Sequence, residues 1–339
     1  MKDEGEMTKQ NEIDWRMIIR RIKDKKFTPI ISDRVFFPGD NAVIPSWARE
    51  IGFPYPTNDG LSIAQLAQYL GINSRDYLTA KEDFLDFSKR YTLDWVKNDR
   101  QLEPGEFLDT LMGELSDLTY SQLATRLDFP KFVNPLDNPL QILAQLPLAI
   151  YVTTSYYDFL EAALRAAGKD PVTEICYWHD DLQDEVPSIF KTDKDFQPTP
   201  QRPLVYHLNG LDAYPASLVI TEDDYLDFLV KVAEDLEAVP RRVTQALSDS
   251  TLLLLGYQLE DWNFKSLFRG LINTRSSSRR LLSLSIQMIP ANMPAEQTEM
   301  RQKVQDYLGR YFDKANFDVY WGTPQEFTQE LWAQWQGIT

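Results

Sequence analysis

Six near-continuous apolar runs follow one another in the second half of the chain, and they constrain the fold more than any other feature. They lie at residues 148–154, 172–178, 203–209, 251–257, 281–286 and 317–322. Stretches with helical periodicity fall between several of them, notably 222–236, 239–248, 262–273, 295–312 and 325–336. Strands that are apolar along their whole length are typical of a parallel sheet covered by helices on both faces. We therefore expect an α/β fold, with one more strand supplied by the apolar run 27–32.

Helical periodicity dominates the first half of the chain. Apolar residues recur at helical spacing from Trp15 to Ile22, with Asn11 or Asp14 as the cap. The pattern divides the chain into an N-terminal helix (1–26), a core (27–59 and 147–339) and a helical insertion (60–146). The acidic, Pro-rich segment 179–203 predicts a long loop.

Composition limits the partners and the compartment. The net charge of −16 argues against a surface for nucleic acid, whose phosphates require clustered Lys and Arg. The basic run Arg275–Arg280 is either a local basic patch or a solvated loop. No apolar stretch is long enough to span a membrane, and the charged start lacks the apolar region of a signal peptide. We expect a cytoplasmic protein.

Metal-binding residues are scarce. Cys176 is the only cysteine, so an intrachain disulfide is impossible. His179 and His207 are the only histidines, so we expect no tetrahedral zinc site.

Four segments carry a family resemblance. They are TTSYYDFLE (Thr153–Glu161), VYHLNG (Val205–Gly210), SLVITEDDY (Ser217–Tyr225) and LLLLGYQLEDWNF (Leu252–Phe264). Together they resemble the sirtuin-like domain of prokaryotic proteins. The resemblance runs from about Phe27 to the C-terminus, and it implies a Rossmann-like core that binds NAD at the carboxyl ends of its strands.

The first motif that the resemblance implies is a Gly-Ala-Gly turn, followed by Ser, that faces the pyrophosphate. The matching residues here include Ser32, Asp33 and Arg34, and both glycines are missing. A side chain hinders close backbone approach, and Asp33 would repel a diphosphate. Arg34 either contacts a phosphate or pairs with Asp33 or Asp40 in a surface loop.

The second motif is Thr-Thr-Asn, whose Asn holds the nicotinamide ribose region. This chain has Thr153, Thr154 and Ser155. Ser155 keeps a hydroxyl but lacks the amide's combination of donor and acceptor. It either contacts the ligand or caps a helix that starts at Tyr156.

The third motif is Leu-His-Gly, whose His acts on the ribose hydroxyl. Here Asn209 precedes Gly210, and an amide cannot serve as a general base. His207 lies two residues earlier on the same face of the strand. It is either a substitute base or a hydrogen-bonded structural residue. The candidate catalytic residues are therefore His207, Asn209 and Ser155.

Two other places match the resembled family better. Thr221 is expected to cap a helix whose acidic first turn suits the helix dipole. Gly256 and Tyr257 follow a strand and would lie beside the adenosine part of NAD, and Trp321 and Gly322 would border the same site.

Two functions follow from the resemblance. The first is a sirtuin-like, NAD-binding-fold protein with its usual catalysis lost or altered, acting as a sensor or subunit in a prokaryotic antiphage or related assembly. The alternative is an active NAD glycohydrolase that uses His207 or residues from a partner chain. Protein deacylation is not expected, given Asn209 and the single cysteine. We expect a homo-oligomer or a subunit of a larger protein assembly.

Overall fold

The structure of the protein is a computed structural model. It describes residues 13–35, 43–54, 61–98, 105–130, 138–235, 238–257, 283–287 and 317–338, together with residues 264, 267, 302, 303, 306, 307 and 310. The predicted helices at 262–273 and 295–312, and Asn11, Asp40 and Arg275–Arg280, lie wholly or mostly outside these residues.

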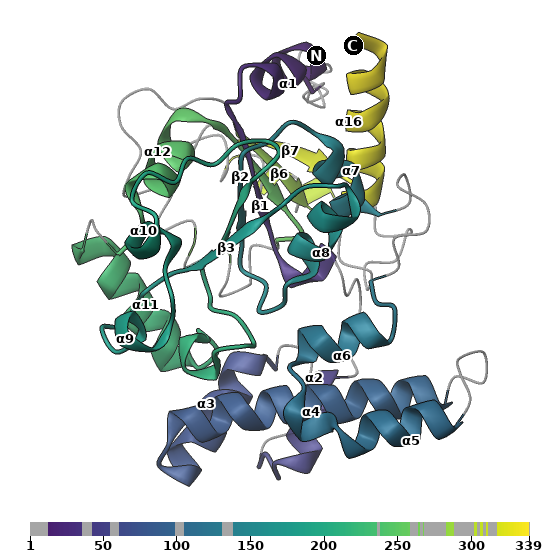
Figure 1. Ribbon diagram of the computed structural model, residues 1–339, viewed down its shortest axis with the longest axis vertical. Coiled ribbons are helices and arrows are strands. Elements are labelled where there is room, and N and C mark those ends of the chain that lie inside the picture. The colour runs from purple at the N-terminus through teal and green to yellow at the C-terminus, as the bar shows by residue number, and fades with distance from the viewer. Residues whose placement is uncertain are drawn as a thin grey trace, which may run out of the picture.

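A seven-stranded parallel sheet forms the centre of the molecule (Figure 1). Its strands are β1 (Phe27–Ile31), β2 (Ile150–Thr153), β3 (Val172–Ile175), β4 (Leu204–His207), β5 (Thr251–Leu255), β6 (Ser283–Gln287) and β7 (Phe317–Trp321). They lie in the order β3-β4-β2-β1-β5-β6-β7, and every pairing is parallel. The predicted α/β class with a parallel sheet is confirmed.

Successive strand residues pack into two different cores, as the two-residue period of a strand requires. Phe27, Ile31 and Leu253 point to one face, where they meet four helices. These are α1 (Trp15–Lys23), α7 (Pro139–Gln145), α8 (Phe159–Ala166) and α16 (Pro324–Ile338). Ile30 and Leu254 point to the other face, which α11 (Glu222–Glu234) and α12 (Arg241–Asp249) cover. Both faces are therefore closed.

Short helices occupy part of the segment predicted as a long loop. They are α9 (Leu182–Glu185) and α10 (Ile189–Thr192). Leu182, Val186 and Phe196 are buried against the same core as α11, and this packing orders the segment. The predicted long loop thus contains two short helices, because its spaced apolar residues pack into the core.

A mainly helical block precedes β2 and lies against one side of the core (Figure 1). It contains α2 (Val43–Glu50), α3 (Ile63–Ser74), α4 (Tyr77–Asn98), α5 (Gly105–Gly113) and α6 (Tyr120–Arg126). Capping boxes begin two of these helices, Ser62 with Gln65 at α3 and Thr119 with Gln122 at α6. Trp47 of α2 is fully buried against Phe84 and Phe87 of α4.

The helical block and the sheet share one hydrophobic cluster. The Phe84 ring lies 6.3 Å from the Tyr156 ring, and the Tyr120 ring lies 4.4 Å from the Tyr157 ring. Tyr156 and Tyr157 directly follow β2, so the block packs against the edge of the sheet where the strands end. In the described parts of the chain, no helix is long and apolar enough to cross a bilayer.

Candidate functional site

The carboxyl ends of β4, β2, β1 and β5 lie side by side at one edge of the sheet, because neighbouring parallel strands end together. The hydrogen-bond ladder continues past them. The Ser32 N–H donates to the Leu255 carbonyl at 3.0 Å, and the Thr154 N–H donates to the Ile31 carbonyl at 3.0 Å. The structure thus brings Ser32, Ser155, Asn209 and Gly256 to four adjacent strand ends.

The junction between β1 and β5 is closed by the protein's own groups. The Ser32 hydroxyl donates to the Gly256 carbonyl at 2.5 Å. Gly256 has φ +83°, and an added Cβ would lie 2.7 Å from the Ser32 hydroxyl oxygen, so only glycine fits there. The hydroxyls of Thr154 and Tyr257 are 2.9 Å apart, and both side chains are buried.

Asp33 lies where the resembled family has a glycine turn, and the residue as a whole is partly buried. It begins the short helix η1 (Asp33–Val35). Its Oδ1 atom is shielded from solvent and has no hydrogen-bond partner among the described residues. Burial raises the pKa of Asp33 to about 7, although a hydrogen bond from Ser155 and the positive charge of His207 oppose the shift. Near neutral pH the carboxyl is therefore only partly ionised.

Ser155 belongs to a tight turn. Its backbone N–H donates to the Thr153 hydroxyl at 2.9 Å, and its own hydroxyl accepts from the Tyr157 N–H at 3.1 Å. Helix α8 begins only at Phe159, with Asp158 at the N-cap position. The interpretation of Ser155 as the N-cap of a helix from Tyr156 is therefore wrong, because these side-chain bonds hold a turn before the helix.

His207 lies in the interior with both ring nitrogens in contact with acceptors. Its Nδ1 is 3.0 Å from the Ser155 carbonyl and its Nε2 is 2.9 Å from Glu161 Oε1. The Thr173 hydroxyl also donates to that carboxylate, at 2.7 Å. Both the His207 and the Glu161 side chains are fully buried. A carbonyl and a carboxylate both accept, so the arrangement favours the doubly protonated imidazolium.

The pKa shifts of this buried pair have opposite directions. Burial by itself would lower the pKa of His207, but the Glu161 charge and the two hydrogen bonds raise it above its ordinary value. Burial by itself would raise the pKa of Glu161, but His207 and Thr173 lower it. Each group therefore keeps the other ionised.

Asn209 and Gly210 begin a loop that folds back over the strand ends. Asn209 is buried, and its carbonyl accepts from the Val219 N–H at 3.0 Å. Gly210 has φ +85°, and a Cβ there would lie 2.3 Å from the Ser217 carbonyl oxygen. Glycine is therefore required for the close approach of the two backbone segments.

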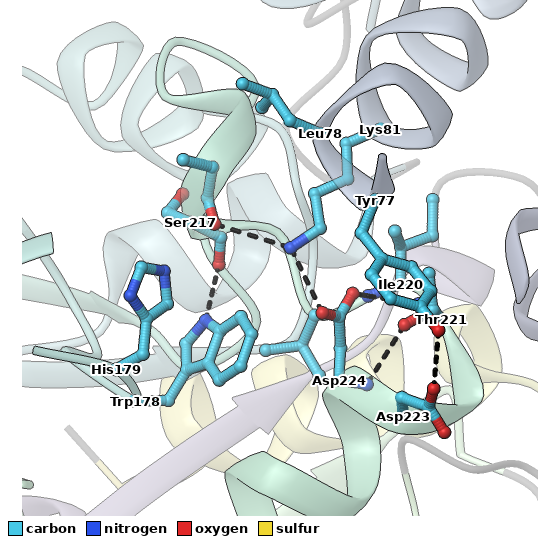
Figure 2. Close-up of polar contacts among 12 residues, drawn as sticks. Tyr77, Leu78, Lys81, Trp178, His179, Ser217, Ile220, Thr221, Asp223 and Asp224 are labelled. Carbon is cyan, nitrogen blue, oxygen red and sulfur yellow. Dashed lines mark hydrogen bonds and ion pairs between the residues drawn. The ribbon is translucent and has the colours of Figure 1, made fainter. Parts of the chain in front are cut away.

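A buried lysine from the helical block holds this loop (Figure 2). The Lys81 ammonium lies 3.1 Å from Asp224 Oδ1 and 5.0 Å from the centre of the Trp178 ring. The Trp178 indole N–H donates to the Ser217 carbonyl at 2.8 Å. Asp224 and Thr221 form the capping box of α11, which confirms the predicted cap. Lys81 thus connects α4 to the loop that follows Asn209.

Other site residues of the sequence analysis lie further away. Trp321 and Gly322 end β7, which β5 and β6 separate from β1. Arg34 is exposed on η1. The grouping at the strand ends therefore consists of Ser32, Asp33, Thr153, Thr154, Ser155, His207, Asn209, Gly210, Gly256 and Tyr257.

Sequence reasoning missed three charged residues of this region. They are Glu161, Lys81 and Asp212. The Ser121 N–H donates to Asp212 Oδ2 at 2.6 Å, and burial raises the pKa of Asp212 to about 6. A signal existed for Glu161, which lies three residues before Leu164 on the apolar face of α8. Among the described residues, no group of three or more His, Cys, Asp or Glu side chains is arranged to hold a metal ion.

A comparison with family models identifies the SIR2-like domain at residues 149–319, half of the chain. This chain belongs to the SIR2-like domain family. The family generally binds NAD. The matched span starts before β2, so β1 and Asp33 lie outside it. No curated protein matches the chain.

The strand ends do not fit a dinucleotide held in the way that the family resemblance implies. The Asp33 carboxyl occupies the turn after β1, and an ionised carboxyl there repels a diphosphate. The Ser32 side chain closes onto Gly256 at the junction where backbone N–H groups would face the phosphates.

Proposed function

We propose that this protein keeps the sirtuin-like architecture without the usual NAD chemistry, and that it acts as a nucleotide sensor or an assembly subunit. The observation that supports this most is the state of His207. Asn209 offers no titratable group, and the one nearby imidazole is buried with both nitrogens in contact with acceptors. A general base must reach the proton that it removes, and both nitrogens of this imidazole already contact other groups of the protein.

The second support is the charge at the end of β1. An ionised Asp33 repels a phosphate placed beside it. Binding of a phosphate there therefore costs free energy, either from this repulsion or from protonation of the carboxyl. A ligand without a diphosphate, or one that meets Asp33 in its neutral form, avoids this penalty. NAD is thus the cofactor that the family suggests, and its binding here is expected to be weak.

One observation favours the alternative function, an active NAD glycohydrolase. The pKa of Asp33, about 7, suits a group that exchanges protons near neutral pH. In that function Asp33, His207 or a residue from a partner chain would replace the missing histidine at Asn209.

Nicotinamide release from NAD distinguishes the two functions. The purified protein is incubated with NAD, and free nicotinamide is measured by chromatography. We expect no release above the buffer control, since loss of general acid–base catalysis typically costs ~10²–10⁴-fold. Rapid release that Asp33→Asn or His207→Gln abolishes, in variants whose circular dichroism is unchanged, would contradict the proposal and establish the base.

The antiphage role is part of the same proposal, and it rests on the family resemblance. A cytoplasmic assembly, either a homo-oligomer or a complex with the products of neighbouring genes, would provide the partners. Co-expression with those neighbours followed by phage challenge tests the role. Protection that is lost when this gene is deleted supports it, and equal phage yield with and without the gene argues against it.

A further inference from the structure

One face of α11 is solvent-exposed and contains both apolar and acidic residues. Its exposed residues, at spacings of three and four, are Asp223, Leu226, Asp227, Val230, Ala233 and Glu234. Such spacing places all six along one stripe of the helix. The opposite side carries Tyr225, Phe228 and Val232, which are buried in the core. The stripe therefore combines an apolar line with carboxylates, and we call it the α11 stripe.

The two large apolar side chains of the stripe are exposed to solvent. Leu226 is 51% exposed and Val230 is 54% exposed. Ile72, near the end of α3, which contacts α11, is also 60% exposed. Tyr77 joins the helical block to the stripe, since its hydroxyl donates to Asp223 Oδ2 at 2.7 Å (Figure 2). Clusters of exposed apolar residues across two elements mark interaction surfaces more often than single ones do.

The charge around these residues has one sign. The stripe contains three carboxylates and no basic residue. Lys231 lies at its border, and its ammonium is already 2.9 Å from Asp180 and 3.2 Å from Asp235. The three carboxylates lie along one side of the apolar line, which fits a partner with basic residues along one side of its own apolar row.

We propose that the α11 stripe binds an amphipathic helix of another protein, with apolar residues in one row and Lys or Arg beside them. Burial of Leu226 and Val230 supplies the binding energy, while Asp223, Asp227 and Glu234 select a basic partner. A second copy of the acidic stripe is disfavoured by like charge. The inference gives a partner chemistry to the proposed assembly subunit, but its test does not depend on NAD turnover.

Two synthetic helical peptides test the stripe on the full-length protein. Both carry the same row of Leu residues, and the flanking positions are Lys in one peptide and Glu in the other. Fluorescence anisotropy of the labelled peptides measures binding. We expect the Lys peptide to bind at least about tenfold more tightly than the Glu peptide, and added salt to weaken it.

Matched variants locate the binding. Leu226→Gln with Val230→Gln should weaken the Lys peptide at least about tenfold, as loss of central apolar contacts does. Asp227→Asn with Glu234→Gln should reduce the salt dependence. Trp95→Gln is the control, since Trp95 is 59% exposed beside Asp94 on α4 and outside the stripe. All variants replace exposed residues, and circular dichroism checks their folding.

Three outcomes overturn the inference. They are equal binding of the two peptides, unchanged binding by the Leu226 and Val230 variant, and equal weakening by Trp95→Gln. Light scattering measures the oligomeric state and so tests whether a second copy of this chain occupies the stripe. If the wild type is an oligomer that Leu226→Gln with Val230→Gln dissociates, the stripe binds a second copy and the proposed basic partner is wrong.

Discussion

Single buried charges decide what the strand ends can do. The ring of His207 has a charged partner, Glu161, within 2.9 Å. Among the described residues the Asp33 Oδ1 atom has no hydrogen-bond partner, and the pKa of Asp33 rises to about 7 because burial outweighs its hydrogen bond from Ser155. His207 is thus stabilised in its charged, protonated form, and Asp33 is stabilised in its neutral, protonated form.

Replacing His207 should destabilise the fold, because it leaves Glu161 buried without its partner. Removal of one member of a buried pair costs about 3–5 kcal/mol. His207 contributes fully below its ordinary pKa of 6.5 and loses this contribution as the pH rises through its raised folded pKa. Glu161 contributes fully above 4.5 and loses this as the pH falls through its lowered pKa.

The loss of stability in His207→Gln should therefore be greatest between about pH 4.5 and 6.5 and smaller at pH 9. Urea unfolding at several pH values measures it. His179→Gln, which removes the other and partly exposed histidine, is the control and should have little effect. A pH-independent difference would show that the charge of His207 contributes nothing.

Asp33→Asn should have the opposite sign. A carboxyl with a raised folded pKa makes the folded state less stable as the pH rises from 3.8 to about 7, because the unfolded chain releases its proton first. The variant removes this penalty, so it should gain up to about 4 kcal/mol at pH 8 and much less at pH 4. Thermal unfolding at the two pH values checks this, and a variant that is less stable at pH 8 contradicts it.

At the scale of elements, one contact joins the helical block to the loop beside the strand ends. Lys81 of α4 bonds to Asp224 of α11 and approaches the Ala216 carbonyl at 3.4 Å. Burial lowers the pKa of Lys81, although Asp224 opposes the shift. This pair positions the loop that carries Asn209 and Gly210.

Lys81→Met should lower the free energy of unfolding by about 3–5 kcal/mol, because it leaves Asp224 buried without its counter-ion. Adding Asp224→Asn to Lys81→Met should recover part of this loss, as a double-mutant cycle measures. The exposed pair Arg20–Asp24 is the comparison, and Arg20→Gln should cost about 0–1 kcal/mol. Equal costs at the two pairs would mean that burial gives the Lys81 pair no special weight.

The whole molecule has one continuous hydrophobic cluster on the α1 side of the sheet. Leu66, Phe84 and Tyr120 of the helical block belong to it, as do Tyr151 and Phe159 of the core. The block also has a smaller aliphatic cluster of its own between α4, α5 and α6, but its buried aromatic side chains belong to the cluster that it shares with the sheet. We therefore expect the core and the insertion to unfold together, although they are separate segments of the chain.

Phe84→Ala tests this at the molecular scale. Loss of a buried phenylalanine costs about 3–5 kcal/mol, and we expect the whole molecule to melt earlier in a single transition. Circular dichroism and tryptophan fluorescence should give the same midpoint. An early separate step in the variant, with the remaining structure melting at the wild-type temperature, would identify the block as an independent unit.

The sequence by itself determined the fold class and the strand ends. Each strand follows from an apolar run, because a strand buried on both faces excludes polar residues, and parallel pairing then fixes which residues end together. Thus Ser32, Ser155, Asn209 and Gly256 were expected at one edge and lie on neighbouring strands. The capping box at Thr221 was also predictable, because a cap depends on residues three positions apart.

Only the tertiary structure decided the electrostatics of the site. His207 and Glu161 are 46 residues apart, and Lys81 and Asp224 lie on different helices, so no local pattern pairs them. The true start of α8 at Phe159 depends on buried hydroxyl bonds around Ser155 that spacing does not reveal. Whether a carboxyl is ionised or protonated depends on burial and partners, and these exist only once distant segments have packed together.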